Sequence, residues 1–136
     1  MDKPLALIVE DEYDISIIFA KALREAGFET DIVRSGKTAL TWLSSTTPDI
    51  VVLDLHLPKV AGTEILEHIR ADPRLEKVAV IVATAYPHMA ERLHDVADWI
   101  FFKPVSFSQL RDLAMRLGAS LPARESDTQG AAPAEG

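Results

Sequence analysis

The sequence predicts an α/β domain in which helices cover both faces of a parallel β-sheet. Four short runs are wholly apolar, as expected of strands that are buried on both faces; they span residues 5–9, 50–53, 78–83 and 99–102. The segments between these runs place apolar residues at helical spacing. Strands that alternate with helices in this way predict a parallel sheet, because each connection must cross back over the sheet.

The first half of the chain contains two predicted helices and a fifth strand. The first helix carries an apolar stripe, and Gly27 can end it in a left-handed conformation. Residues 28–33 alternate in part between apolar and polar, as expected of a strand with one wetter face. Ser35–Gly36 is expected to begin a second helix. The stripe of the first helix consists of Ile15, Ile18, Phe19, Ala22 and Leu23.

The second half of the chain contains three further predicted helices. The third follows Gly62 and ends at Asp72–Pro73, because a proline disfavours helical geometry in the residue before it. Residues 87–96 form a short fourth helix at most, since their apolar residues are sparse. The last helix is expected to start with a capping box, in which Ser106 is the N-cap and Gln109 the third helical residue, and to end at Gly118.

Length and composition indicate one domain. We expect residues 1–118 to form it and residues 119–136, rich in Ala, Pro, Ser, Glu and Gly, to be a disordered tail or linker. The net charge of −7 and the absence of a basic run argue against direct binding of nucleic acid. The chain has no cysteine, no apolar stretch of membrane-spanning length and no signal-peptide pattern. We therefore expect a cytoplasmic protein.

Polar side chains follow the predicted strands at the point where each strand ends. Glu10 and Asp11 follow the first run, Asp54 the second, Thr84 the third and Lys103 the fourth. In an open parallel sheet, sites form in the crevice outside the carboxyl ends of the strands. Clustered carboxylates repel one another, and Mg²⁺, which prefers oxygen ligands, would offset that repulsion. The sequence therefore predicts a pocket for a divalent cation and a phosphoryl group.

Asp54 is the candidate nucleophile of this pocket. A carboxylate that attacks a phosphoryl group forms an aspartyl phosphate, and an ionised aspartate needs no general base. Phosphoryl transfer otherwise requires positioning and charge neutralisation, which Mg²⁺ and Lys103 would supply. Any one of these residues alone could be a turn residue, a helix cap or an acidic first turn. Their joint placement at strand ends favours the pocket.

Right-handed crossovers permit two strand orders for such a sheet, one typical of dinucleotide-binding domains and one flavodoxin-like. The dinucleotide-binding fold needs a G-x-G-x-x-G turn after its first strand. Acidic residues stand there instead. The sequence therefore favours the doubly wound, flavodoxin-like order 2-1-3-4-5.

Taken together, these residues resemble the receiver domain of bacterial response regulators. The resemblance spans residues 4 to about 118 and implies the strand order 2-1-3-4-5. It also implies that Asp54 is the phosphoacceptor. The matching stretches are LIVEDE at 7–12, PDIVVLDLHLP at 48–58 with Gly62 behind it, ATA at 83–85 and Lys103–Pro104.

The resemblance assigns further roles within the pocket. Glu10 and Asp11 would be the acidic pair for Mg²⁺, with Asp54 and the backbone carbonyl of His56 completing the protein ligands. Thr84 and Lys103 would hold the phosphoryl oxygens, together with the backbone N–H groups of His56 and Ala85. The Lys103–Pro104 peptide bond is often cis in this family, which would aim the ammonium group into the pocket.

Two departures from the family pattern fall in the region that transmits the signal. Ile100 stands three residues before the lysine, where the family often has a Tyr or Phe that reports phosphorylation. The chain between Thr84 and Lys103 is also about three residues shorter than the family pattern, so the fourth helix should be truncated. Tyr86 could replace the missing aromatic residue or control the access of water. His56 occupies another position that tunes the lifetime of the phosphate in this family.

The aromatic residues near the end of the last strand and the four histidine side chains are given structural interpretations. Trp99, Phe101 and Phe102 are expected mostly in the sheet core, with some of them bordering a surface used for partners. Trp99 stands where many DNA-binding relatives have an acid that pairs across a dimer. The spacing of the histidines matches no compact metal-ligand motif, so we expect them on helix surfaces. They are His56, His68, His88 and His94.

The leading hypothesis is a single-domain response regulator in two-component phosphorelay signalling. A sensor histidine kinase or phosphotransfer protein would donate the phosphoryl group, and output would pass through contacts with a downstream protein. A homodimer through the face of the fourth helix, fifth strand and fifth helix fits this class, and neither nucleic acid nor membrane is expected as a partner. Such a protein is an enzyme only in catalysing its own phosphorylation and dephosphorylation.

Two alternatives remain at this point. Ile100 and the short fourth helix suggest a pseudo-receiver, an interaction module whose partner binding does not depend on phosphorylation. An aspartyl-nucleophile phosphatase is the other. That chemistry usually needs a second acid two residues after the nucleophile, where this chain has His56.

Overall fold

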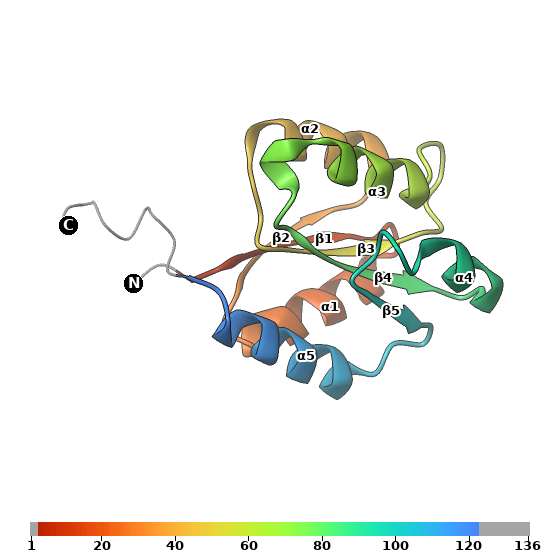
Figure 1. Ribbon diagram of the computed structural model, residues 1–136. Coiled ribbons are helices and arrows are strands. Elements are labelled where there is room, and N and C mark those ends of the chain that lie inside the picture. Colours follow the sequence, from red (N-terminus) through yellow and green to blue (C-terminus); the bar gives the residue numbers. More distant parts are fainter. Residues whose placement is uncertain (1–2, 123–136) are drawn as a thin grey trace.

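The computed structural model describes residues 3–122 and contains a five-stranded, all-parallel sheet in the order β2-β1-β3-β4-β5 (Figure 1). This arrangement confirms the predicted fold class and strand order. Residues 123–136 of the predicted tail lie outside the described range. The strands are β1 (Leu5–Val9), β2 (Glu29–Val33), β3 (Ile50–Asp54), β4 (Ala79–Thr84) and β5 (Trp99–Phe102).

The helices cover the sheet in two layers. α1 and α5 lie on one face, and α2 and α3 lie on the other (Figure 1). The short α4 adds Leu93 to the core on the α2 and α3 side. The helices are α1 (Tyr13–Glu25), α2 (Gly36–Ser45), α3 (Gly62–Ala71), α4 (Ala90–Leu93) and α5 (Phe107–Ala119), with 3₁₀ turns η1 (Pro73–Leu75) and η2 (Pro87–Met89).

The interior strand β1 shows why the predicted runs are apolar throughout. Successive side chains of a strand point to opposite faces. Leu7 and Val9 pack into the core on the α2 and α3 side, whereas Ala6 and Ile8 pack into the core on the α1 and α5 side. All four are 0% exposed. Because both faces of the sheet are covered, neither set of alternating positions can be polar.

Several predicted helix ends are confirmed. Gly27 follows α1 with a φ of 102°, the left-handed conformation that glycine adopts without strain. Ser35 is the N-cap of α2 and accepts a hydrogen bond from the backbone N–H of Thr38. Ser106 caps α5 by accepting from the backbone N–H of Gln109. These side chains satisfy backbone donors that the first helical turn leaves unpaired.

Two expectations were wrong. Gly118 does not end the last helix, which continues to Ala119, and the ring of Phe28 lies 3.2 Å from where a Cβ of Gly118 would stand. Trp99 and Phe102 are not core residues, since they are 39% and 49% exposed. The reason is that β5 forms the sheet edge beside β4, and Trp99 borders an open groove between β5 and α5.

The chain from α4 to β5 is anchored by α3. Arg70 donates from Nε to the carbonyl oxygen of Val96 at 2.7 Å and from a terminal nitrogen to the Asp98 carboxylate at 2.8 Å. Asp98 also accepts from the backbone N–H of Val80. These contacts fix the end of the shortened segment against the sheet.

Within residues 3–122, no helix is long and apolar enough to span a bilayer.

Ala61, at the end of the loop between β3 and α3, offers a test of how capping of α3 contributes to stability. It occupies the N-cap of α3 in extended geometry without a side-chain cap, and Glu64 is the third helical residue. Ala61→Ser would create a capping box with Glu64, so we expect the free energy of unfolding to rise by about 1 kcal/mol. Urea denaturation measures this change.

The matched control is the capped helix α2. Ser35→Ala should lower the free energy of unfolding by about 1 kcal/mol, because it removes the acceptor for Thr38 N–H. An Ala61→Ser variant no more stable than wild type would show that this N-terminus gains nothing from a hydroxyl.

Candidate functional site

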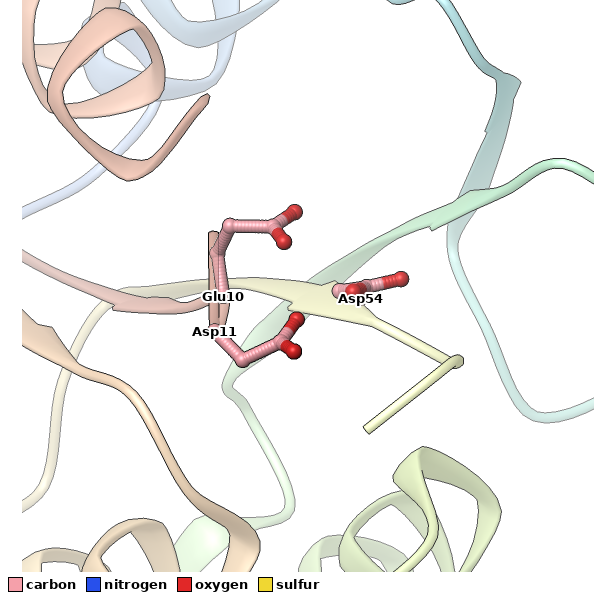
Figure 2. A group of neighbouring side chains, drawn as sticks. All are labelled: Glu10, Asp11 and Asp54. Atoms are coloured by element: carbon pink, nitrogen blue, oxygen red, sulfur yellow. The ribbon is translucent and has the colours of Figure 1, made fainter. Parts of the chain in front are cut away.

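The carboxyl ends of four neighbouring strands bring the predicted site residues together. Glu10 and Asp11 follow β1, and Asp54 is the last residue of β3. A carboxylate oxygen from each of the three lies within 4.8 Å of the others, and Figure 2 shows the three groups around one space. Glu10 is 0% and Asp54 2% exposed, and Asp11 is more accessible than either. The structure therefore contains a dense, largely buried negative cluster.

Lys103 brings a positive charge into this cluster from the end of β5. Its Nζ lies 3.1 Å from Glu10 Oε1 and 3.4 Å from Asp54 Oδ1. The side chain of Lys103 is 20% exposed, so water screens these contacts less than it would at the surface. The peptide bond between Lys103 and Pro104 is cis.

The ionisation of Glu10 and Lys103 reflects this crowding. Burial, followed by the negative charge of Asp54, raises the pKa of Glu10 to about 7, although the hydrogen bond from Lys103 opposes the shift. Burial acts to lower the pKa of Lys103, but its hydrogen bond to Glu10 and the charge of Asp54 outweigh burial and raise that pKa. The single positive charge of Lys103 thus only partly offsets the negative charge of the three clustered carboxylates, so binding of a further cation there would be favourable.

The loop after β3 approaches Asp54 closely. The backbone N–H of His56 donates to Asp54 Oδ1 at 3.0 Å. At Gly62, where the loop turns into α3, a Cβ would lie 2.6 Å from the carbonyl oxygen of Asp54 and the Cα of Leu55. A side chain at this position would therefore push the loop away from the end of β3.

Thr84 and the residues after it form the opposite wall. Thr84 is 1% exposed, and its Oγ1 accepts a hydrogen bond from the backbone N–H of Tyr86 at 3.0 Å. A cavity of about 270 Å³ opens between this wall and the acids. Six of the predicted residues line it, together with Glu12 and Ile15 at the start of α1, whereas the buried Glu10 and Thr84 do not. The lining residues are Asp11, Glu12, Ile15, Asp54, His56, Ala85, Tyr86 and Lys103.

Sequence reasoning missed Glu12 and Ile15 as parts of the cavity. Ile15 is one of the apolar residues at helical spacing in the first helix, which is the signal of a core residue. The only available signal was their position directly after the acidic pair at the end of a strand. Ile100 does not line this cavity; it packs against the core on the α3 and α4 side.

The donor set of the cluster suits Mg²⁺. Three carboxylates offer oxygen ligands only, which is what Mg²⁺ requires, and there is no thiolate in the chain.

The four histidines are all exposed, as expected, but only His68 lies within an α-helix. His56 lies in the loop after β3, and its imidazole ring contacts the ring of Tyr86.

Comparison with known proteins gives a consistent result. The family model described as the response regulator receiver domain matches residues 6–115. The chain is 34% identical over 110 residues to the phosphate regulon transcriptional regulatory protein PhoB of Rhizobium meliloti (strain 1021), covering 79% of this chain and 48% of that protein. It thus spans about half the length of that relative.

Two further relatives are closer to this chain in length. Sporulation initiation phosphotransferase F of Bacillus subtilis (strain 168) is 31% identical over 109 residues, covering 78% of this chain and 86% of that protein. The solved Mn²⁺-bound form of the response regulator Rcp1 superimposes with a TM-score of 0.72 at 25% identity, covering 91% of this chain and 98% of that one. With a family model that matches most of its length, this chain belongs to the response regulator receiver domain family.

Proposed function

We propose that this chain is a phosphoacceptor of two-component signalling and that Asp54 receives the phosphoryl group. One observation carries the proposal. The Asp54 carboxylate, 2% exposed, lies beside a cavity with two further carboxylates within 4.8 Å and the Lys103 ammonium at 3.4 Å. Such a group is a signalling acceptor rather than an enzyme acting on a separate substrate. We place its action in the cytoplasm, with a histidine kinase or phosphotransfer protein as the donor.

The contacts of Asp54 divide its two oxygens between two tasks. His56 N–H and Lys103 Nζ both lie against Oδ1. The other oxygen is then the one to attack the phosphorus atom of a donor phosphohistidine. The new bond joins the Asp54 oxygen to phosphorus, the phosphorus–nitrogen bond breaks, and the donor imidazole leaves. Lys103 and the Thr84 hydroxyl would hold the phosphoryl oxygens.

The negative cluster would hold Mg²⁺ through Asp11, Asp54 and the backbone carbonyl of His56, with Glu10 behind them. When bound, Mg²⁺ neutralises negative charge on the transferred group. The Mn²⁺-bound form of Rcp1 supports a divalent cation in this fold. Glu10, which is fully buried and bonded to Lys103, positions that lysine.

The chemistry of the product tests the proposal. An aspartyl phosphate is an acyl phosphate, so hydroxylamine at neutral pH should release it, whereas phosphate esters of serine, threonine or tyrosine should resist. We expect phosphate transferred from an autophosphorylated histidine kinase to be lost on hydroxylamine treatment. Phosphate that survives this treatment would contradict an aspartyl acceptor.

The first turns of α1 are the surface we propose for the phosphodonor protein. Tyr13, Ile17 and Ile18 are 66%, 38% and 48% exposed, and the same helix lines the cavity through Ile15. The Arg34 guanidinium stacks on the Tyr13 ring at 4.6 Å and donates to Ser16 Oγ at 2.8 Å, which fixes that ring beside the site. A donor that reaches Asp54 through this cavity must pass this apolar patch.

Removing apolar side chains from this patch should slow phosphoryl transfer from a protein donor without changing transfer from a small-molecule donor. We expect the double substitution Ile17→Ala and Ile18→Ala to slow transfer from a histidine kinase about tenfold, which corresponds to about 1.4 kcal/mol. Labelling by a small-molecule phosphodonor should not change. Met115→Ala on α5, which is 50% exposed in wild type, is the matched control. Equal slowing with both kinds of donor would mean that α1 acts on the site and not on docking.

We propose that output passes through protein contacts on the face of α4, β5 and α5, where a homodimer is one expected arrangement. Trp99, Phe101, Leu113 and Met115 line a groove of about 590 Å³ between β5 and α5. Trp99 and Met115 are 39% and 50% exposed. Analytical ultracentrifugation with and without phosphodonor would show whether two copies associate here.

A further inference from the structure

Strand β5 carries an aliphatic side chain, Ile100, at the position three residues before Lys103. Ile100 is partly buried and packs against the core on the α3 and α4 side. An aliphatic side chain can neither donate nor accept a hydrogen bond, so it cannot respond to a change at the Thr84 hydroxyl through one. A change at Asp54 must reach the surface through other residues.

Two backbone N–H groups connect the reacting residues to the loops around them. His56 N–H donates to Asp54 Oδ1, and Tyr86 N–H donates to Thr84 Oγ1, both at 3.0 Å. The side chains of His56 and Tyr86 meet, with ring centroids 5.4 Å apart and planes tilted by 58°. This ring pair therefore connects the two loops. One ring belongs to the residue that is hydrogen-bonded to Asp54, and the other to the residue that is hydrogen-bonded to Thr84.

Tyr86 continues this connection to the surface. It is 44% exposed, and the centroid of the His88 ring lies 5.9 Å from that of its own ring. The carbonyl oxygen of Tyr86 accepts from the backbone N–H of Met89 at 3.0 Å, at the end of η2. Beyond α4, Arg70 holds the carbonyl oxygen of Val96. The η2–α4 segment is thus tied to the site at one end and to α3 at the other.

We infer that Tyr86, rather than strand β5, carries the state of Asp54 to the η2–α4 segment. The inference rests on the proposed function, because phosphorylation of Asp54 is the change that it transmits. The new bond removes the carboxylate charge that His56 N–H now faces and places phosphoryl oxygens within reach of the Thr84 hydroxyl. Both loops respond at their hydrogen bonds, the Tyr86 ring repacks against His56 and His88, and η2 and α4 move with it.

Beryllofluoride, which binds carboxylates as a phosphoryl mimic, provides the test in the whole chain with Mg²⁺. A bound ¹⁹F resonance reports occupancy of the site, and ¹H–¹⁵N spectra report the backbone from Met89 to Leu93. In wild type we expect both the bound resonance and shifts of these amides. Tyr86→Phe should retain the shifts, since it keeps the ring. Tyr86→Leu, compared at saturating beryllofluoride, should lose them.

The control is Ile100→Val, which should behave as wild type in both spectra. Shifts that persist in Tyr86→Leu while the bound ¹⁹F resonance is present would overturn the inference, as would their loss in Ile100→Val. A saturated wild-type site with unmoved Met89–Leu93 amides would also overturn it and would instead indicate an interaction module that does not respond to phosphorylation. Absence of bound beryllofluoride in wild type would refute the proposed function itself, and with it this inference.

Discussion

Asp54→Asn is expected to abolish phosphoryl acceptance while leaving the fold intact. The substitution removes the attacking oxygen, and an amide is not a nucleophile toward phosphorus under these conditions. The fold should persist because Asn keeps an oxygen that can accept from His56 N–H, and because one charge leaves a cluster of three carboxylates. Transfer of labelled phosphate from a histidine kinase, followed over time, measures the loss.

Two further variants distinguish the role of Asp54 as acceptor from the role of the groups around it. Lys103→Ala should still bind Mg²⁺ but respond poorly to phosphorylation, because the contacts at 3.1 Å and 3.4 Å to Glu10 and Asp54 are lost. The control is Asp49→Asn, which lies just before β3, at the opposite end of that strand from Asp54, and should be labelled as wild type. Normal labelling of Asp54→Asn would refute the assignment of the acceptor.

The metal-free protein should become less stable as the pH rises from about 5 to 7. The pKa of Glu10 is raised from 4.5 to about 7 in the folded protein, by burial first and by the charge of Asp54 second. Between these values the folded state binds more protons than the unfolded state, so the free energy of unfolding falls with rising pH. Each pKa unit corresponds to about 1.4 kcal/mol, so the fall is of the order of 3 kcal/mol at most. The raised pKa of Lys103 acts only at higher pH.

Mg²⁺ should reverse this trend, because a bound cation favours the ionised acids. Urea midpoints measured between pH 5 and pH 8, in a chelator and in Mg²⁺, test both statements. We expect stabilisation by Mg²⁺ to be greater at pH 8 than at pH 5. Glu10→Gln should flatten the slope of the metal-free protein. A metal-free stability that rises across this interval would contradict the account of Glu10.

The fold could be predicted because local and global signals agree. The apolar runs correspond to strands whose side chains are buried on both faces, and Ser35, Gly27 and Ser106 mark helix ends as predicted. The edge of the sheet could not be predicted in the same way. Trp99 and Phe102 are residue types typical of a core, and their exposure follows from the position of β5 at the edge of the sheet.

The candidate site was predicted as a set of residues but not as a set of interactions. The strand ends placed Glu10, Asp54 and Lys103 in one layer, which the structure confirms. The sequence did not indicate that Glu10 is fully buried and bonded to Lys103, since two adjacent acids look equivalent in a sequence. Nor did it place Arg34 over Tyr13, because that contact joins the residue after β2 to the first residue of α1, and no local sequence pattern relates them.

Intact-protein mass spectrometry after incubation with a small-molecule phosphodonor tests the central claim most directly. The wild-type chain should gain the mass of a single phosphoryl group in the presence of Mg²⁺, and little or none in a chelator. Asp54→Asn should gain none under either condition. A wild-type chain that takes up no phosphate with Mg²⁺, or an Asp54→Asn chain that is modified equally, would contradict the proposal that Asp54 is the phosphoacceptor.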